Sequence, residues 1–334
     1  MHVIAARKLG SSRVLLSVQG CAASRAASTS SVSATRYGFI GLGNMGASMA
    51  LNLSASAGDK VFVYDVVAAN ASLVVEKAGG KAVTASSVAE LAAACNVIIT
   101  MVPNTQHVQT LMESIFKHAK QGSLIIDCST IDPITSRNLS REAAALPSKL
   151  VMMDAPVSGG VTGAAAATLT FMCGGTDEAV RRASPVLSLM GKKIVHCGEA
   201  GSGGVTKLCN NLSLAISMAG TAEALNLGIK LGMDGKKLAE VMNTSTARCW
   251  SSDSYNPVPG IAPNVPSSRD YEGGFGSALM LKDLKLALDS GRGGGLDLNK
   301  AMPMGSRAAQ LYTDVCDAGL AQRDFSVVYK YFKG

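Results

Sequence analysis

A lysine and an asparagine lie close together in a helical segment rich in apolar residues in the second half of the chain. Lys207 and Asn211 are four residues apart, so a helix would carry both side chains on one face. The ordinary interpretation is a solvated lysine and a surface amide, but neighbours such as Leu208 and Leu212 would make their burial costly without a purpose. Because a desolvated lysine exchanges its proton more easily, Lys207 is a candidate general acid and base. Asn211 would orient the substrate or the lysine.

A glycine-rich hexapeptide near the start of the chain has the spacing G-x-G-x-x-G. It follows an apolar run and opens a helical pattern, and its residues are Gly41, Leu42, Gly43, Asn44, Met45 and Gly46. In that setting the first glycine permits a tight turn, the second lets the backbone approach a pyrophosphate, and the third allows close helix–strand packing. The anion would lie at the positive end of the helix. Glycines also make plain turns, so the hexapeptide needs support from its surroundings.

An aspartate at the end of the next apolar run supplies that support. Asp65 follows Val61–Tyr64 and stands 19 residues beyond Gly46, where a carboxylate can accept hydrogen bonds from an adenosine ribose. The same charge would repel a 2′-phosphate. The sequence therefore predicts NAD rather than NADP as the cofactor, and the alternative is that Asp65 only caps the following helix.

Two later strand ends and one glycine pair are expected to complete the pocket, because ligands of parallel sheets bind beyond the carboxyl ends of the strands. Val102-Pro103 and Ser129-Thr130 occupy such ends, although each could be a helix-entry turn. Further on, Ser158-Gly159-Gly160 offers a hydroxyl and two unhindered backbone N–H groups, which suit a carboxylate. A plain glycine turn between strands is the alternative there.

The order of apolar and helical segments predicts the architecture that positions these residues. From Arg36 to Gly198 short apolar runs alternate with helical patterns, which indicates a parallel, doubly wound sheet. After Gly201 long segments rich in Ala, Leu and Met take over. We therefore expect an α/β Rossmann-type dinucleotide-binding domain over residues 36–198 and an all-α C-terminal domain, for substrate binding and dimerisation, over residues 199–334. Strands are expected at Tyr37–Ile40, Val61–Tyr64, Val97–Val102, Leu124–Ile126, Leu150–Met153, Thr168–Met172 and Ile194–His196.

Three further expectations concern the second half of the chain. The longest uncharged helical candidate, between Lys207 and Glu223, falls short of a membrane span and is expected to be a buried central helix. Trp250–Tyr271, rich in Ser, Pro and Gly, is expected to be an ordered loop or a mobile lid. The apolar helices after Gly204 exceed what one small helical domain would bury, which predicts a homo-oligomer, either a dimer or a tetramer.

The basic charge of the chain belongs to its first residues. The formal net charge is +7, but residues 1–36 contain five Arg or Lys and no Asp or Glu, which leaves +2 for the rest. Neither this charge nor an aromatic content of 4% suits nucleic-acid binding. A start rich in Ser, Ala and Arg predicts a transit peptide over residues 1–35 and a place in the mitochondrial matrix; a disordered tail is the alternative.

Scattered cysteines and histidines lack ligand spacing, so no metal site is predicted.

Three of these motifs, in this order, resemble the signatures of the β-hydroxyacid dehydrogenases. They are the glycine hexapeptide, Asp154–Gly160 and Gly201–Asn211. The resemblance implies an NAD-binding domain followed by an all-helical one. It also implies that Ser158-Gly159-Gly160 binds the substrate carboxylate, that Lys207 is the catalytic acid and base, and that Asn211 binds substrate beside it.

Two more segments extend the resemblance. Met280–Leu284 is similar to the family's Lys-Asp-Leu helix, which implies that Lys282 closes over the nicotinamide and the substrate and that Asp283 helps to hold the site; alone, the two would be an exposed helix pair. Arg248–Gly260 resembles the members that oxidise (S)-3-hydroxyisobutyrate to methylmalonate semialdehyde in valine breakdown. His107 falls where relatives often place a polar contact with NAD, and its role is left open. Ala167 stands where the family usually has glycine.

Two alternatives of function remain at this point. A reductase of the same family acting on tartronate, succinic or glyoxylic semialdehyde would differ mainly in its pocket, and Asp65 disfavours it where NADPH is required. A non-catalytic nucleotide-binding protein or chromatin reader that kept the fold would be marked by loss of the lysine, and Lys207 and Asn211 are both present.

Overall fold

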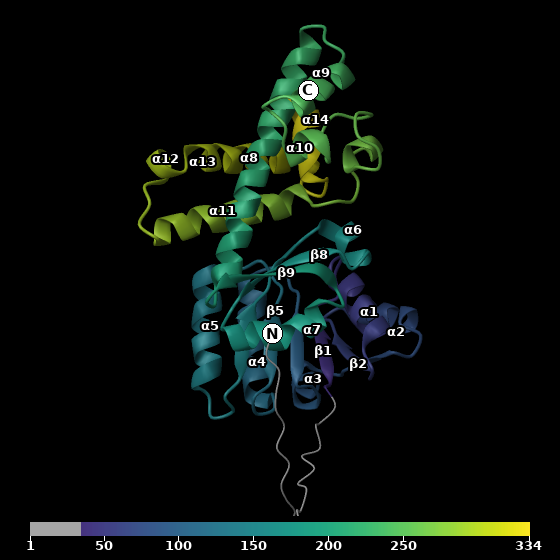
Figure 1. Cartoon of the computed structure of the whole chain (residues 1–334), viewed down its shortest axis with the longest axis vertical. Coiled ribbons are helices and arrows are strands. Elements are labelled where there is room, and N and C mark those ends of the chain that lie inside the picture. The colour runs from purple at the N-terminus through teal and green to yellow at the C-terminus, as the bar shows by residue number, and fades with distance from the viewer. Residues whose placement is uncertain (1–34) are drawn as a thin grey trace, which may run out of the picture. The chain divides into compact units, whose positions relative to one another are not determined.

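The computed structural model describes residues 35–334, so the predicted transit peptide lies outside the described part of the chain. One sheet occupies the first half of that part, and Figure 1 shows it with helices packed around it. Its strands are β1 (Tyr37–Ile40), β2 (Val61–Tyr64), β3 (Ala82–Thr84), β4 (Val97–Thr100), β5 (Leu124–Asp127), β6 (Val151–Asp154), β7 (Val157–Ser158), β8 (Leu169–Gly174) and β9 (Gly191–Gly198). The seven predicted strands are confirmed to within a few residues; β3 and β7 were missed.

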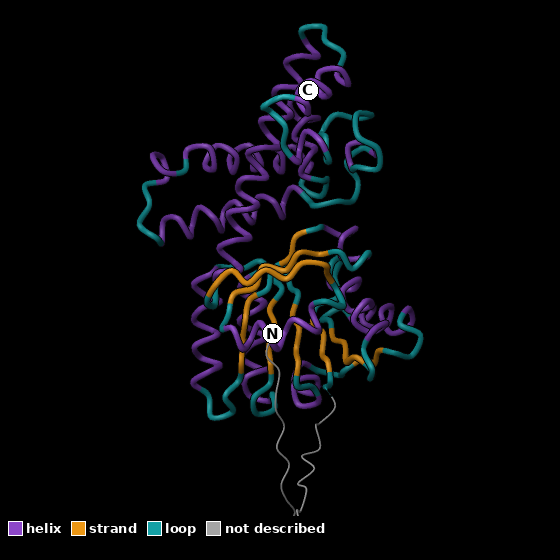
Figure 2. The backbone as a smooth tube through the Cα atoms, in the orientation of Figure 1, coloured by secondary structure: helices purple, strands orange, loops and turns teal. Residues whose placement is uncertain are grey.

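The first six strands in the sheet are parallel, in the order β3-β2-β1-β4-β5-β6. Beyond β6 the prediction of a wholly parallel sheet is wrong. β8 is antiparallel to β6 through the single pair Asp154↔Gly174 and antiparallel to β7, and β9 is parallel to β8. The physical reason is the short connection between β7 and β8, which cannot return the chain to the starting edge as a crossover does. Figure 2 shows β8 and β9 running at an angle to the parallel strands.

Apolar side chains cover both faces of the parallel strands. Along β4, Ile98 and Ile99 are fully buried and belong to different core clusters, as do Ile125 and Ile126 along β5. Two buried faces are what helices on both sides of a parallel sheet require. The helices of this half of the chain are α1 (Gly46–Ser56), α2 (Ala68–Lys77), α3 (Val88–Ala94), α4 (Thr105–His118), α5 (Pro133–Ala145), α6 (Gly160–Ala165) and α7 (Asp177–Leu187).

From Ser202 onward the described chain is helical, with a core of its own. Met218, Met280 and Tyr312 are fully buried in that core. The fold is thus a Rossmann-type domain followed by an all-α domain. The helices are α8 (Ser202–Lys230), α9 (Gly235–Thr244), α10 (Trp250–Asp253), α11 (Ser277–Gly293), α12 (Leu298–Ala301), α13 (Pro303–Val315) and α14 (Val328–Lys333), with short turns of other helix types at Pro266–Arg269, Cys316–Leu320 and Phe325–Val327.

The long helix α8 is less buried than the sequence predicts. Its apolar window has a mean hydropathy of 1.3, and only 28% of that window is buried. By length and composition alone α8 is long and apolar enough to cross a membrane, so the expectation that it falls short of a span is wrong on those two measures. It packs against α11, α13 and α14 within the helical half, and it carries polar residues that are buried there. The expectation of a buried central helix is therefore wrong for much of its surface.

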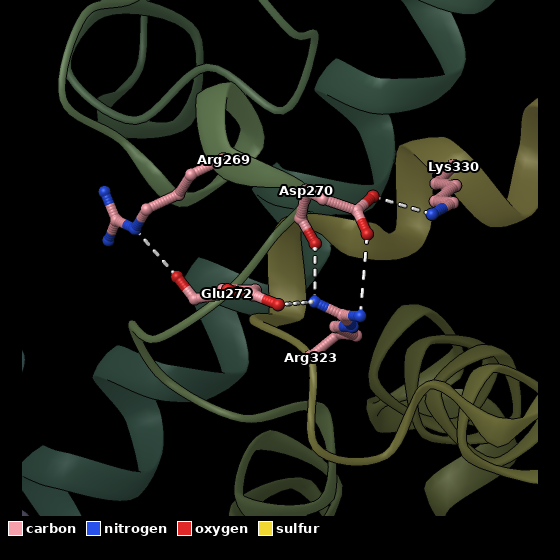
Figure 3. A network of polar contacts seen from close by, with 5 residues as sticks. All are labelled: Arg269, Asp270, Glu272, Arg323 and Lys330. Atoms are coloured by element: carbon pink, nitrogen blue, oxygen red, sulfur yellow. Dashed lines mark hydrogen bonds and ion pairs between the residues drawn. The ribbon is translucent and has the colours of Figure 1, made fainter.

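The segment Trp250–Tyr271 is an ordered loop that contains α10 and a 3₁₀ turn. Arg323 pairs with Asp270 and Glu272, and Lys330 Nζ lies 2.7 Å from Asp270 Oδ1, so ion pairs join the loop to the C-terminal segment (Figure 3). Next to Arg323 in the chain, the buried Asp324 accepts hydrogen bonds from Tyr255 Oη at 3.0 Å and from the Phe275 N–H at 2.7 Å. The buried contacts contribute more to this order than the exposed pairs, which are screened by water.

Candidate active site

Lys207 and Asn211 lie one turn apart on α8, and both are buried in the described structure. Lys207 is 9% exposed and Asn211 is 2% exposed. The Asn211 Nδ2 group donates to Asp283 Oδ2 of α11 at 2.6 Å, and Asn210 Nδ2 donates to Asn211 Oδ1 at 3.0 Å. The Asn211 amide is thus held at both ends.

Lys282 of α11 reaches the carboxyl edge of the sheet. Its Nζ donates to the Thr130 carbonyl at 2.8 Å and to the Pro103 carbonyl at 3.3 Å, and it lies 3.1 Å from Asp283 Oδ1. One ammonium group therefore joins the ends of β4 and β5 to α11. Asp283 is 2% exposed, and its Oδ1 accepts no hydrogen bond from the described residues, so this oxygen keeps acceptor capacity beside the ion pair.

The surroundings of Lys207 weaken the preference for its charged form. Burial lowers the pKa of the Lys207 ammonium below its usual range, Asp283 raises that pKa, and Lys282 lowers it further. Among the hydrogen bonds of residues 35–334, none ends on Lys207 Nζ. A lysine with a lowered pKa and no fixed partner can accept a proton from a bound molecule and return it.

The glycine hexapeptide forms the turn between β1 and α1. Gly41 has φ 93°, and a Cβ there would collide with the Met101 carbonyl; a Cβ at Gly46 would collide with the carbonyl of Gly41. A Cβ at Gly43 would meet nothing within 4 Å. Packing within the protein therefore requires the first and third glycines. Gly43 faces open space just before α1, so its backbone is open to the approach of a ligand.

Asp65 is turned toward this hexapeptide. Its Oδ2 accepts from the Leu42 N–H at 2.6 Å, and its Oδ1 accepts from the Val67 N–H at 2.8 Å. α2 begins after Val67 and has no side-chain cap, so the alternative that Asp65 caps this helix is wrong. The carboxylate stands beside the nucleotide turn, where an adenosine ribose would meet it.

The ends of β4 and β5 are tied together by a buried carboxyl group. Thr100 Oγ1 donates to Asp127 Oδ1 at 2.8 Å, the Ser129 N–H donates to the same oxygen at 3.1 Å, and the Val102 N–H donates to Ser129 Oγ at 2.9 Å. Burial raises the pKa of Asp127 to about 6, and its Oδ2 has no partner in the described structure. These hydrogen bonds fix the backbone positions of Val102 and Ser129 beyond the ends of β4 and β5.

Two predicted groups are not drawn into the cluster around Lys207. Ser158 pairs with Thr170 of β8 at the end of β7, and Gly159 (φ 136°) and Gly160 (φ 63°) lead into α6. His107 is exposed in the first turn of α4, where its N–H donates to Asn104 Oδ1. Within residues 35–334 no hydrogen bond or ion pair joins either group to Lys207, Asn211 or Lys282.

Two buried carboxyl groups, Asp127 and Asp154, were not predicted as site residues. They end the neighbouring strands β5 and β6 and are paired in register. Asp154 accepts hydrogen bonds from the N–H groups of Gly201 and Gly204 at the start of α8. The signal in the sequence was an acidic residue at the end of an apolar run. A carboxyl group in such a place is costly to bury unless it is hydrogen-bonded.

Together these groups define the class of the protein. A dinucleotide turn opens the sheet, and a helical domain brings a buried lysine, an amide and an ion pair to two neighbouring strand ends. This is the arrangement of a nicotinamide-dependent dehydrogenase, with a buried lysine of the helical domain placed beside the ion pair at the strand ends.

Comparison with known proteins gives the particular family. Residues 36–198 match the family model described as the NAD binding domain of 6-phosphogluconate dehydrogenase, and residues 201–332 match that described as NAD-binding of NADP-dependent 3-hydroxyisobutyrate dehydrogenase. The chain is 48% identical over 305 residues to the probable mitochondrial 3-hydroxyisobutyrate dehydrogenase of Dictyostelium discoideum, with 90% of this chain and 92% of that one covered. It is 46% identical to the mitochondrial human enzyme, with 92% and 89% covered.

A solved structure agrees with these relatives. The 3-hydroxyisobutyrate dehydrogenase of Mycobacterium tuberculosis with L-serine superposes with a TM-score of 0.82 at 40% identity, covering 90% of this chain and 99% of that one. The chain belongs to the 3-hydroxyisobutyrate dehydrogenase family, and it is an NAD-dependent oxidoreductase.

Proposed function

We propose that the chain oxidises (S)-3-hydroxyisobutyrate to methylmalonate semialdehyde with NAD, a step of valine breakdown, and that Lys207 is the general acid and base. The observation that carries this proposal is the buried Lys207 on α8, beside the ion pair of Lys282 and Asp283. Lys282 in turn contacts the carbonyls of Pro103 and Thr130 at the edge where a nicotinamide would lie.

Each residue of the site has a chemical task in this proposal. NAD, when bound, supplies the acceptor for the hydride that leaves the substrate carbon. Neutral Lys207 accepts the proton of the substrate hydroxyl in the same step, and its ammonium form returns a proton in the reverse reaction. Asn211, fixed by Asp283, donates or accepts at the substrate oxygen. Ser158, Gly159 and Gly160 bind the carboxylate with a hydroxyl and free N–H groups, and Lys282 covers both ligands.

The dinucleotide site favours NAD over NADP. The glycine turn Gly41–Gly46 receives the pyrophosphate, Val102, Pro103 and Thr130 border the nicotinamide, and His107 is a further candidate contact. Asp65 would repel a 2′-phosphate, and it is followed by Val66 and Val67, which are 86% and 53% exposed. Two apolar side chains in that place provide no cation for a phosphate.

The second part of the proposal concerns location and assembly. The relatives are named mitochondrial, which together with the basic start of the chain supports a mitochondrial protein; we place it in the matrix. We divide the chain into a transit peptide (1–35), an NAD-binding domain (36–198) and a helical domain (199–334). Self-association, as a dimer or tetramer, would cover apolar side chains of the helical domain, among them Leu227, Leu231 and Trp250, which are 61%, 77% and 49% exposed.

The test is a substrate screen of the purified protein, followed by the absorbance of NADH. (S)-3-hydroxyisobutyrate and L-serine are compared as substrates for oxidation, and tartronate, succinic and glyoxylic semialdehydes as substrates for reduction. We expect the highest kcat/KM with (S)-3-hydroxyisobutyrate and a preference for NAD over NADP of about ten-fold or more. No turnover of that acid, or a higher kcat/KM for one of the other semialdehydes, would contradict the proposal.

A further inference from the structure

Asp154, the last residue of β6, contacts the first turn of α8, the helix that carries Lys207 and Asn211. Its Oδ1 accepts from the Gly201 N–H at 2.5 Å, and its Oδ2 accepts from the Gly204 N–H at 2.8 Å. The first N–H groups of a helix lack partners within the helix and carry partial positive charge. A buried carboxylate of the sheet, 3% exposed, satisfies two of them.

Glycines line the space around this carboxylate, where a side chain would not fit. A Cβ at Gly174 would lie 2.5 Å from Asp154 Oδ1, and a Cβ at Gly203 would lie 2.7 Å from Asp154 Oδ2 and would collide with the carbonyl of Met172. Gly201 has φ 86°, and a Cβ there would lie 2.7 Å from the carbonyl of Pro133. The first turn of α8 is therefore in close contact with β6, β8 and α5 at once, which leaves it little room to shift.

The same turn sets the place of Lys207. Gly203, Lys207 and Asn211 follow at intervals of four residues and so lie on one face of α8. At a rise of about 1.5 Å per residue, Lys207 stands about 6 Å along the axis from Gly203. Asn211, one turn further, is held by Asp283 of α11. Two buried carboxylates on different elements therefore fix the stretch of helix that presents the lysine.

We propose that Asp154 is a positioning residue, whose carboxylate sets the depth and rotation of the first turns of α8 so that Lys207 reaches the reacting hydroxyl. The inference rests on the proposed function, because the depth of Lys207 matters only to a reaction that uses its Nζ. Asp154 itself touches neither substrate nor cofactor in this scheme. Displacing a reacting group by about 1 Å can lower a rate by about 100-fold, so a small shift of this turn is enough.

Two variants disturb the contact from opposite sides, and a third is their control. Asp154→Asn keeps the shape of the side chain but replaces one acceptor oxygen with an NH₂ group that faces a helix N–H. Gly203→Ala leaves the carboxylate intact and adds a methyl group that presses on both the Met172 carbonyl and Asp154 Oδ2, so it pushes the first turn of α8 away from the sheet. Gly220→Ala makes the same change further along α8, where a Cβ would meet nothing within 4 Å. Hydrogen exchange followed by mass spectrometry reports on the local order of residues 199–207.

For both variants we expect kcat to fall by about 10- to 100-fold, while KM for the acid and Kd for NAD change by less than about three-fold. Exchange over residues 199–207 should be faster than in the wild type. Gly220→Ala should match the wild type in kcat, KM, Kd for NAD and exchange over residues 199–207. A lower unfolding midpoint with wild-type kcat would show a structural role only and overturn the proposal. Equal losses of kcat and of NAD affinity would also overturn it. If Asp154→Asn does not fold, Gly203→Ala alone decides by the same criteria.

A measurement without substrate separates this inference from the proposed function. Competitive acetylation of Lys207 over a range of pH reports on its protonation and exposure whether or not (S)-3-hydroxyisobutyrate is turned over. Absence of turnover by the wild type would reject the function. Unchanged acetylation of Lys207 and unchanged exchange in Asp154→Asn would reject the positioning role.

Discussion

The amide of Asn211 and the carboxylate of Asp283 are joined by a 2.6 Å hydrogen bond between α8 and α11. The second oxygen of Asp283 lies 3.1 Å from Lys282 Nζ, so one buried carboxylate holds an amide with one oxygen and an ammonium with the other. The charges of Asp283 and Lys282 both act on the pKa of Lys207. Burial is the largest influence on the pKa of the candidate base, and two adjacent residues of α11 then act on it in opposite directions.

Replacing Lys207 with methionine should abolish turnover and leave cofactor binding intact. The methionine keeps most of the apolar stem but cannot exchange a proton, and loss of general acid–base catalysis costs about 10²- to 10⁴-fold in rate. NAD binds at the glycine turn, so its Kd, measured by quenching of protein fluorescence, should stay within about two-fold of the wild type. Lys285→Met on the exposed side of α11 is the matched control. A Lys207→Met variant with most of its activity would remove Lys207 from its role.

The neighbours of Lys207 should move its pKa in opposite directions. Asp283 stabilises the ammonium form, so Asp283→Asn should lower the pKa of Lys207; Lys282 disfavours the ammonium form, so Lys282→Met should raise it. Alcohol oxidation needs neutral Lys207, and its rate rises as pH increases through that pKa. The rising limb of kcat/KM against pH should therefore move to lower pH in the first variant and to higher pH in the second. Shifts of the same sign in both variants would contradict this assignment.

Asp65 should control the choice of cofactor. Asp65→Asn removes the charge that would repel a 2′-phosphate and retains one oxygen that can accept from the Leu42 N–H. We expect the ratio of kcat/KM for NAD to that for NADP to fall by about 10-fold or more, mainly through a lower KM for NADP. The steady-state constants with both cofactors provide the measurement. An unchanged ratio would show that the ribose contact lies elsewhere.

The parallel core of the sheet could be predicted because its strands are apolar on both faces and alternate with helical patterns, some of which begin with a capping residue. Asp132 accepts from the N–H groups of Ile134 and Thr135 at the start of α5, as the Asp-Pro pair indicates. β3 and β7 were not predicted because strands of three and two residues are too short to show a periodic pattern of apolar residues. The antiparallel direction of β8 depends on the short connection between β7 and β8. The pattern of apolar residues does not reveal the length of that connection, because β7 was not predicted.

A site residue could be predicted from the sequence when its apolar neighbours make its burial costly. A contact between two residues far apart in the chain could not. Lys207 and Asn211 interrupt an apolar run, so their burial could be expected from neighbouring letters. The bond from Gly201 to Asp154 spans 47 residues, and the contact of Lys282 with Thr130 spans 152, so neither has a local signature. The exposed surface of α8 was missed because hydropathy does not separate a buried helix from one whose apolar side faces outward.

Asp127 should make the protein less stable as pH rises toward neutrality. Its pKa of about 6 in the folded protein lies above the ordinary value of 3.8, so between these values the folded state binds more protons than the unfolded chain. Stability should therefore fall as pH rises through this window, and the loss should be complete above it. Asp127→Asn cannot titrate.

The unfolding free energy of Asp127→Asn, relative to that of the wild type, should therefore increase by about 1–3 kcal/mol between pH 4 and pH 7. Urea unfolding followed by circular dichroism, at constant ionic strength, measures it. Thr100→Val is the companion variant: it removes the hydroxyl that favours the ionised Asp127, so the decline of its stability should extend to higher pH. A difference between Asp127→Asn and wild type that does not change with pH would mean that Asp127 stays ionised in its buried position.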